Sequence, residues 1–255
     1  MFLEIDGHQL ATSWYGQADR TFVGHGGWVG SSELWHEPFQ LMQSSWRCIS
    51  YDHRGCGISV FPASSISAEA LVDDLFRVLD HYQVGRCVLS GESLGGLTCL
   101  SAVLRDPARF DGLVLIDSAP RADPNGVQGL AAGARHDFPA TVQSFVDACI
   151  PDPSRQHLRH WGRQILLRAD PEAAARMMEV FLDLAPDLTQ VDVPTLVVHG
   201  SDDLIIPIGA AKALAAGISG AELFVIDDAG HVPTITRAPE LVAEIERWYA
   251  GVHPA

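Results

Sequence analysis

Strand-like and helix-like segments alternate along most of this chain, and the alternation restricts its fold more than any other feature. Short apolar runs typical of buried strands lie at 21–23, 46–51, 86–90, 113–116, 195–198 and 222–226. Segments with helical spacing of apolar residues lie between or after them, at 31–43, 67–82, 94–104, 208–216 and 239–250. Strand and helix in regular turn are typical of a mostly parallel sheet with helices on both faces. The first residues, 2–15, instead predict a hairpin that turns at Asp6-Gly7.

The alternation stops after Asp117 and resumes near residue 195. Residues 120–190 contain no convincing strand, and their apolar spacing predicts helices at 140–150, 156–168 and 171–184. We therefore expect a core domain formed by residues 1–119 and 191–255, and a helical insertion formed by residues 120–190. Because the insertion would leave and rejoin the sheet at neighbouring strands, it could lie as a lid over the carboxyl ends of the strands.

Charge and composition exclude several classes of protein. The chain has 255 residues, of which 47% are hydrophobic, and its formal net charge is −15, so we expect a globular protein that repels nucleic acid and anionic membrane surfaces. No apolar run approaches the roughly 20 residues that span a bilayer. Glu4 and Asp6 stand where a secretory signal would be basic. Five cysteines without framework spacing indicate reduced thiols, so we predict a cytoplasmic protein.

The sequence Gly-Glu-Ser-Leu-Gly-Gly at 91–96 directly follows a predicted strand and begins a predicted helix. This is the context of a nucleophile elbow, a tight turn that exposes a serine hydroxyl at the N-terminus of a helix. Such a turn needs small residues two positions before and after the serine, and Gly91 and Gly95 meet that need. The pattern predicts that Ser93 is a nucleophile.

A nucleophilic serine requires a base, and the base requires an orienting carboxylate. His231 is the best candidate for the base, because Gly230 and Pro233 indicate a shaped loop just after the last predicted strand. Asp203, which follows the preceding strand, is the favoured carboxylate. Asp202 and Asp117 remain alternatives, since the first is adjacent and the second also follows a strand.

An acyl-transfer site also needs donors for the oxyanion that forms on the attacked carbonyl. The sequence His-Gly-Gly-Trp at 25–28 follows an early strand, and its glycines allow close approach of the backbone. We expect the backbone N–H groups of Gly27 and Leu94 to be these donors, with the N–H of Trp28 as the alternative to Gly27.

Together, these segments and the Asp-His-Arg-Gly-Cys-Gly loop at 52–57 resemble the α/β-hydrolase superfamily over nearly the whole chain. The resemblance implies the α/β-hydrolase fold, with a mostly parallel central sheet, flanking helices and a helical cap inserted after the sixth strand. The superfamily includes esterases, lactonases, C–C bond hydrolases, haloperoxidase-like enzymes and a few hormone receptors. Its epoxide hydrolases and haloalkane dehalogenases use an aspartate nucleophile, so Ser93 argues against those activities.

Four residues are candidates for contact with a substrate. Trp28 and Trp35 lie beside the expected oxyanion loop, and Trp161 belongs to the insertion. Glu92, where many relatives have His, Asn, Phe or Tyr, either stabilises the charged form of His231 or serves a structural role by hydrogen bonding to a neighbouring strand. Further apolar residues of the insertion could line a pocket: Phe138, Phe145, Ile165, Met177, Met178 and Phe181.

The expected activity is hydrolysis of a carboxylic ester or lactone of a small, largely apolar molecule, through an acyl-enzyme and without a cofactor. His157 and His160 have a spacing found in metal sites, but no third ligand is evident, so we expect no metal. The alternatives are a C–C bond hydrolase, a haloperoxidase-like enzyme, or a ligand-binding receptor with slow turnover. We expect a monomer or a homodimer.

Overall fold

The computed structural model describes residues 1–254, whose centre is one sheet of eight strands. The strands are β1 (Phe2–Ile5), β2 (His8–Tyr15), β3 (Thr21–His25), β4 (Arg47–Tyr51), β5 (Cys87–Glu92), β6 (Phe110–Ile116), β7 (Thr195–Gly200) and β8 (Glu222–Ile226). Their order across the sheet is β1-β2-β4-β3-β5-β6-β7-β8. The six strands from β4 to β8 in this order run parallel, and β2 is antiparallel to both of its neighbours. Asp6 and Gly7 both have positive φ, as the predicted hairpin turn requires.

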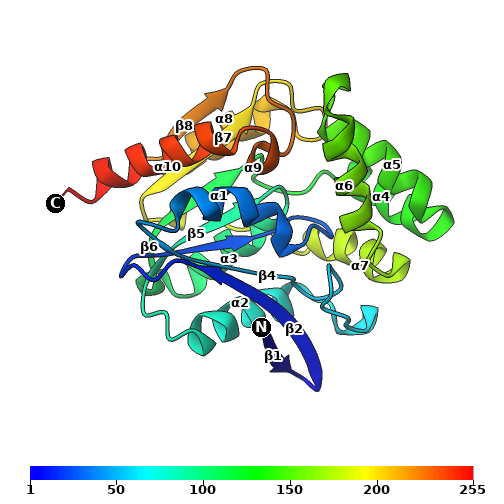
Figure 1. Cartoon of the computed structure of the whole chain (residues 1–255), viewed down its shortest axis with the longest axis horizontal. Helices are drawn as coiled ribbons and strands as arrows, with labels where there is room; N and C mark the ends of the chain where they lie inside the picture. The colour runs from blue at the N-terminus through cyan, green and yellow to red at the C-terminus, as the bar shows by residue number, and fades with distance from the viewer. Residues whose placement is uncertain (255) are drawn as a thin grey trace.

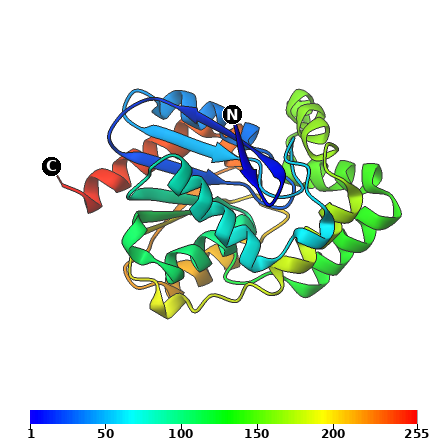
Figure 2. The same ribbon diagram turned by 90° about the horizontal axis from the view of Figure 1, so that it is seen from below.

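Helices cover both faces of the sheet and bury two apolar cores, as expected for a parallel sheet. One core lies beneath α1 (His36–Met42) and α10 (Ala238–Val252), and the other beneath α2 (Ala68–His81), α3 (Gly95–Arg105) and α8 (Ile208–Gly217). Figure 2 shows the two groups of helices on opposite sides of the sheet, with α10 in red. The α/β-hydrolase fold expected from the sequence is confirmed.

The segment between β6 and β7 is helical, as predicted. It contains α4 (Pro124–His136), α5 (Phe138–Cys149), α6 (Gln156–Leu166) and α7 (Pro171–Phe181), which gather at one end of the sheet (Figure 1). β6 and β7 pair directly, so the insertion begins and ends at neighbouring strands. The treatment of residues 120–190 as a separate lid domain stays a prediction.

Helix α4 was not among the helices predicted from the sequence. Three glycines, Gly126, Gly129 and Gly133, weaken the helical pattern there. Its start is nevertheless well encoded, because the side chain of Asp123 accepts a hydrogen bond from the N–H of Gly126, and Pro124 occupies the first turn.

Among the hydrogen bonds that attach the insertion to the sheet domain, two involve His231 and Trp28. The backbone N–H of His231 donates to the carbonyl oxygen of Cys149 at the end of α5, at 3.0 Å. The indole Nε1–H of Trp28 donates to the carbonyl oxygen of Ala174 in α7, at 2.9 Å. None of the helices within residues 1–254 combines the length and the apolar character needed to cross a bilayer.

Candidate active site

Ser93 lies on a strained turn between β5 and α3. Its φ is 54°, in the left-handed region that residues with a side chain rarely adopt. The turn depends on its glycines: a Cβ on Gly91 would lie 2.6 Å from the Cα of Gly96, and one on Gly95 would lie 2.2 Å from the carbonyl oxygen of Gly26. Backbone atoms cannot move away as a flexible side chain can, so the geometry of the turn requires the glycines that the sequence has at 91 and 95.

A chain of hydrogen bonds connects Ser93 with His231 and Asp203. The Nδ1 atom of His231 lies 2.8 Å from Oδ2 of Asp203, and its Nε2 atom lies 2.9 Å from Oγ of Ser93. A carboxylate can only accept, so Nδ1–H donates to Asp203, and the neutral ring then accepts the Ser93 hydroxyl proton at Nε2. The structure thus brings together the three residues that the sequence nominated as nucleophile, base and carboxylate.

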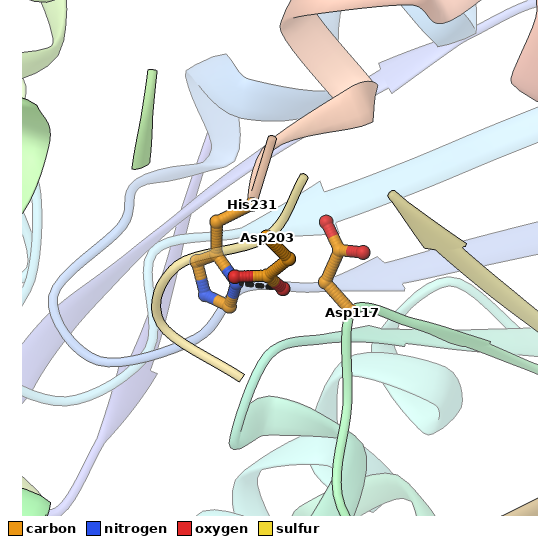
Figure 3. A group of neighbouring side chains, drawn as sticks. All are labelled: Asp117, Asp203 and His231. Atoms are coloured by element: carbon orange, nitrogen blue, oxygen red, sulfur yellow. Dashed lines mark hydrogen bonds and ion pairs between the residues drawn. The ribbon is translucent and has the colours of Figure 1, made fainter. Parts of the chain in front are cut away.

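The two alternative carboxylates occupy different places. Asp202 is exposed and accepts a hydrogen bond from the Ser201 hydroxyl. Asp117 is fully buried beside Asp203 and His231 (Figure 3), but its Oδ1 atom accepts from the backbone N–H of Gly200 and its Oδ2 atom has no partner. Only Asp203 is hydrogen-bonded to the imidazole, and the N–H groups of Ile205 and Ile206 hold its other oxygen.

The buried acids strongly affect the titration of this site. Burial alone would lower the pKa of His231, but the negative charges of Asp203, Asp117 and Glu92 outweigh it and raise the pKa to about 9. Burial likewise opposes ionisation of Asp203, yet His231 and the N–H donors hold its pKa below the usual value. Burial raises the pKa of Glu92 to about 7 and that of Asp117 well above its usual value.

Asp117, Asp203 and His231 are also close enough to share a cation, since one ligand atom from each lies within 4.8 Å of the others. Both ring nitrogens of His231 are already engaged, however, one with Asp203 and one with Ser93. A cation would have to displace one of these bonds, so the donor set fits a hydrogen-bonded triad better than a metal centre. Within residues 1–254 no other His, Cys, Asp or Glu forms such a group with His157 and His160.

The predicted oxyanion loop lies against the nucleophile. A Cβ built on Gly27 would be 2.7 Å from Cβ and 3.3 Å from Oγ of Ser93, so only glycine allows this approach. The backbone N–H groups of Gly27, Trp28 and Leu94 donate to no backbone or side-chain acceptor within the described residues. The N–H of Leu94 belongs to the first turn of α3, where the helix dipole also favours negative charge.

Two cavities adjoin Ser93. The larger, of about 360 Å³, extends between the loop after β6, helix α4 and the loop before α8, and Arg121, Leu130 and Ile206 are among its lining residues. The smaller, of about 60 Å³, lies beside His231 and is closed by α5 and α6. Substrate pockets commonly measure about 300–1,000 Å³, so the larger cavity is of ordinary size for a ligand.

The four residues predicted to contact a substrate lie in different environments. Trp28 lines both cavities, and Glu92 lines the smaller one, where it accepts a hydrogen bond from Thr234 at 3.2 Å. The prediction for Trp35 is wrong: its ring is 1% exposed and packs against Phe22 and Phe39 in the core beneath α1. Trp35 is the last residue of helix η1 (Ser32–Trp35), and its ring fills the space beside Gly24 of β3, where a Cβ would lie 2.5 Å from it.

Two of the six further apolar candidates in the insertion line these cavities. Phe145 lines both cavities and Met178 the larger one. Trp161 lines neither and packs half-buried against the core, so a substrate contact there stays a prediction. The remaining four candidates are buried core residues: Phe138, Ile165, Met177 and Phe181.

Sequence reasoning missed the walls formed by α4 and by the residues that precede α8. Val127 and Leu130 of α4 and Ile205 and Ile206 line the larger cavity. The Asp123-Pro124 start signal could have revealed α4, whereas no local signal indicates which of its faces meets the pocket.

A family model described as the alpha/beta hydrolase fold matches residues 20–183 and 181–238, and the chain belongs to this family. Among its relatives are a candidate carbamate hydrolase, RutD, of Agrobacterium fabrum, 30% identical over 83% of this chain and 85% of that protein, and a pimeloyl-[acyl-carrier protein] methyl ester esterase of Nitrosomonas europaea, 27% identical over 85% of this chain and 90% of that protein. The solved structure of the enol-lactonase from Burkholderia xenovorans LB400 superimposes with a TM-score of 0.91 at 23% identity, over 97% of this chain and 99% of that one. At that identity the superposition speaks for the fold alone.

Proposed function

We propose that this protein hydrolyses carboxylic esters or lactones of small, largely apolar molecules through an acyl-enzyme on Ser93. The observation that carries the proposal is the continuous hydrogen-bonded chain from Asp203 through His231 to a serine held on a strained turn. The named activities of relatives, on a methyl ester and on an enol-lactone, support the same type of bond.

The mechanism follows from these positions. Oγ of Ser93 attacks the substrate carbonyl while Nε2 of His231 takes its proton, and Asp203 holds the ring tautomer and stabilises the imidazolium. The N–H groups of Gly27 and Leu94 bind the developing oxyanion, and one such donor typically contributes about 3 kcal/mol to transition-state stabilisation. His231 then protonates the leaving alkoxide and later activates the water that releases the acyl group.

The alternatives differ in substrate rather than in fold. A C–C bond hydrolase, a haloperoxidase-like enzyme and a receptor with slow turnover could all retain these three residues. The activities named for relatives, on a methyl ester and on an enol-lactone, support ester or lactone hydrolysis rather than these alternatives. A cytoplasmic location, a monomeric or homodimeric state, and the lack of nucleic-acid and membrane partners stay predictions.

The test combines covalent labelling with turnover. We expect a fluorophosphonate to label Ser93, identified by peptide mass spectrometry, and to abolish hydrolysis of methyl esters and γ- or δ-lactones at the same rate. Ser65→Ala, which removes a half-exposed hydroxyl that bonds to the carbonyl of Pro62 and lines neither cavity, should be labelled as the wild type is. Turnover that continues while Ser93 remains unlabelled, or the absence of any ester or lactone turnover, would contradict the proposal.

Glu92 should set the pH range of activity. Above pH 7 its carboxylate is ionised and stabilises the imidazolium of His231, so the neutral base is lost as the pH falls below about 9. Glu92→Gln removes this charge and lowers the pKa of His231, so the fall in kcat/KM should move to lower pH by about one unit. The two profiles should converge below pH 6, where Glu92 is protonated.

The measurement is kcat/KM of a methyl ester from pH 5 to 10. Glu244→Gln, which removes a charge from α10 outside this cluster, should keep the wild-type profile. An unshifted profile for Glu92→Gln would mean that Glu92 serves only the hydrogen bond to Thr234.

A further inference from the structure

The two cavities beside Ser93 are separated by a wall of aromatic side chains. Trp28 and Phe145 line both of them, with ring centroids 4.9 Å apart and planes at 75°. The hydrogen bond from Trp28 Nε1 to the carbonyl of Ala174 fixes the indole, which is only 4% exposed. Ser93 is the third residue common to both cavities, so the cavities meet at the nucleophile.

The residues that line only one of the two cavities differ in their chemistry. His231 lines only the smaller cavity, whereas the two expected oxyanion donors lie one on each side, Gly27 beside the smaller cavity and Leu94 beside the larger one. In ester hydrolysis the base must reach the oxygen of the leaving alcohol to protonate it, whereas the acyl group has no such requirement. The leaving group must therefore lie on the His231 side.

From this placement we infer that the enzyme selects esters with a small alcohol and a larger, apolar acyl group, and the inference rests on the proposed function. The acyl group occupies the cavity of about 360 Å³, and the alcohol occupies the cavity of about 60 Å³. At the roughly 30 Å³ that one water molecule occupies in the liquid, the smaller volume holds about two groups of that size, which suits methoxide or ethoxide better than a longer alkoxide.

The walls of the larger cavity support an uncharged acyl group. Apart from Arg121 and Asp123, which carry opposite charges, its lining side chains are uncharged and predominantly apolar. Asp123 is engaged as the cap of α4. An acyl chain of four to six carbons would therefore meet mainly apolar side chains in this cavity, among them Leu130, Met178 and Ile206.

The test is a two-way series of esters. One arm keeps methanol as the alcohol and lengthens the acyl group from acetate to hexanoate. The other arm keeps hexanoate and enlarges the alcohol from methyl to n-butyl and benzyl. We expect kcat/KM to rise at least tenfold along the first arm, since each buried methylene contributes up to about fourfold, and to fall at least tenfold along the second.

Two variants test which cavity holds the acyl group and which holds the alcohol. Ile235→Ala enlarges the smaller cavity and should raise the ratio of kcat/KM for butyl over methyl hexanoate about tenfold. Ala210→Phe fills the larger cavity and should lower the ratio for methyl hexanoate over methyl acetate about tenfold. Leu223→Ala, at the edge strand β8, should leave both ratios at their wild-type values.

The outcomes separate the inference from the proposed function. If Ile235→Ala changes the acyl ratio and Ala210→Phe the alcohol ratio, or if the wild type prefers large alcohols with short acyl groups, the assignment is overturned while ester hydrolysis stands. If no ester of either arm is hydrolysed, or if Ser93→Ala hydrolyses them as the wild type does, the proposed function itself fails.

Discussion

Ser93→Ala is expected to lower kcat on a methyl ester by about 10⁴-fold to 10⁶-fold, and His231→Ala by a similar factor. The two side chains act as one unit, because the imidazole accepts the proton of the hydroxyl over a single bond of 2.9 Å. The double variant should therefore be no slower than either single variant, since removing the second member of a broken unit costs nothing more. Stopped assays with purified proteins and hours-long incubations can measure all three rates.

Ser101→Ala provides the matched control. Ser101 lies on α3, the helix that begins at the elbow, and its hydroxyl bonds only to the carbonyl of Leu97. This variant should retain the wild-type rate. If the losses for Ser93→Ala and His231→Ala multiply in the double variant, the two residues act independently and the acyl-enzyme mechanism is wrong.

Asp203→Asn is expected to lower kcat by about 10⁴-fold without changing the fold. A carboxamide can donate a hydrogen bond to Nδ1, so the ring would carry its proton on Nε2, where it cannot accept the proton of Ser93. The fall should persist at every pH, because it comes from the wrong tautomer rather than from a shifted titration.

Asp117→Asn tests whether the neighbouring buried carboxylate, rather than Asp203, orients the ring of His231. Asp117 bonds to the N–H of Gly200 through one oxygen and makes no hydrogen bond to His231, and burial raises the pKa of its carboxyl well above the usual value. We expect less than a tenfold change in kcat, because an amide keeps the shape of the carboxyl group and its oxygen can still accept the hydrogen bond from the N–H of Gly200. A larger loss for Asp117→Asn than for Asp203→Asn, in kcat measured side by side, would assign the orienting role to Asp117 instead.

The sequence was sufficient to predict the sheet and the three residues of the hydrogen-bonded chain, because each follows a strand and sits in a local pattern of glycine or proline. It favoured Asp203 but could not exclude Asp117, since the two residues follow neighbouring strands. The structure distinguishes the two. The loop after β7 places the carboxylate of Asp203 against Nδ1 of His231, whereas the carboxylate of Asp117 accepts the backbone N–H of Gly200.

The pocket residues were predicted less well, for a physical reason. An apolar side chain can be buried in a protein core or can line a ligand cavity, and its spacing in the sequence does not distinguish these two environments. Trp35 fills the space above Gly24, where a Cβ would lie 2.5 Å from its ring, and Trp161 packs between core clusters. Trp28, only seven residues before Trp35, faces the nucleophile instead.

The attachment of the helical insertion has a consequence for protein engineering. In the insertion, the carbonyl oxygen of Cys149 accepts a hydrogen bond from the backbone N–H of His231, and that of Ala174 accepts one from the indole N–H of Trp28. Excising α4–α7 and joining β6 to β7 with a short linker would therefore not produce an open enzyme with broader substrate tolerance. Such a truncation would remove the partners of these two hydrogen bonds, so we expect it to disturb the positions of His231 and Trp28 beside Ser93.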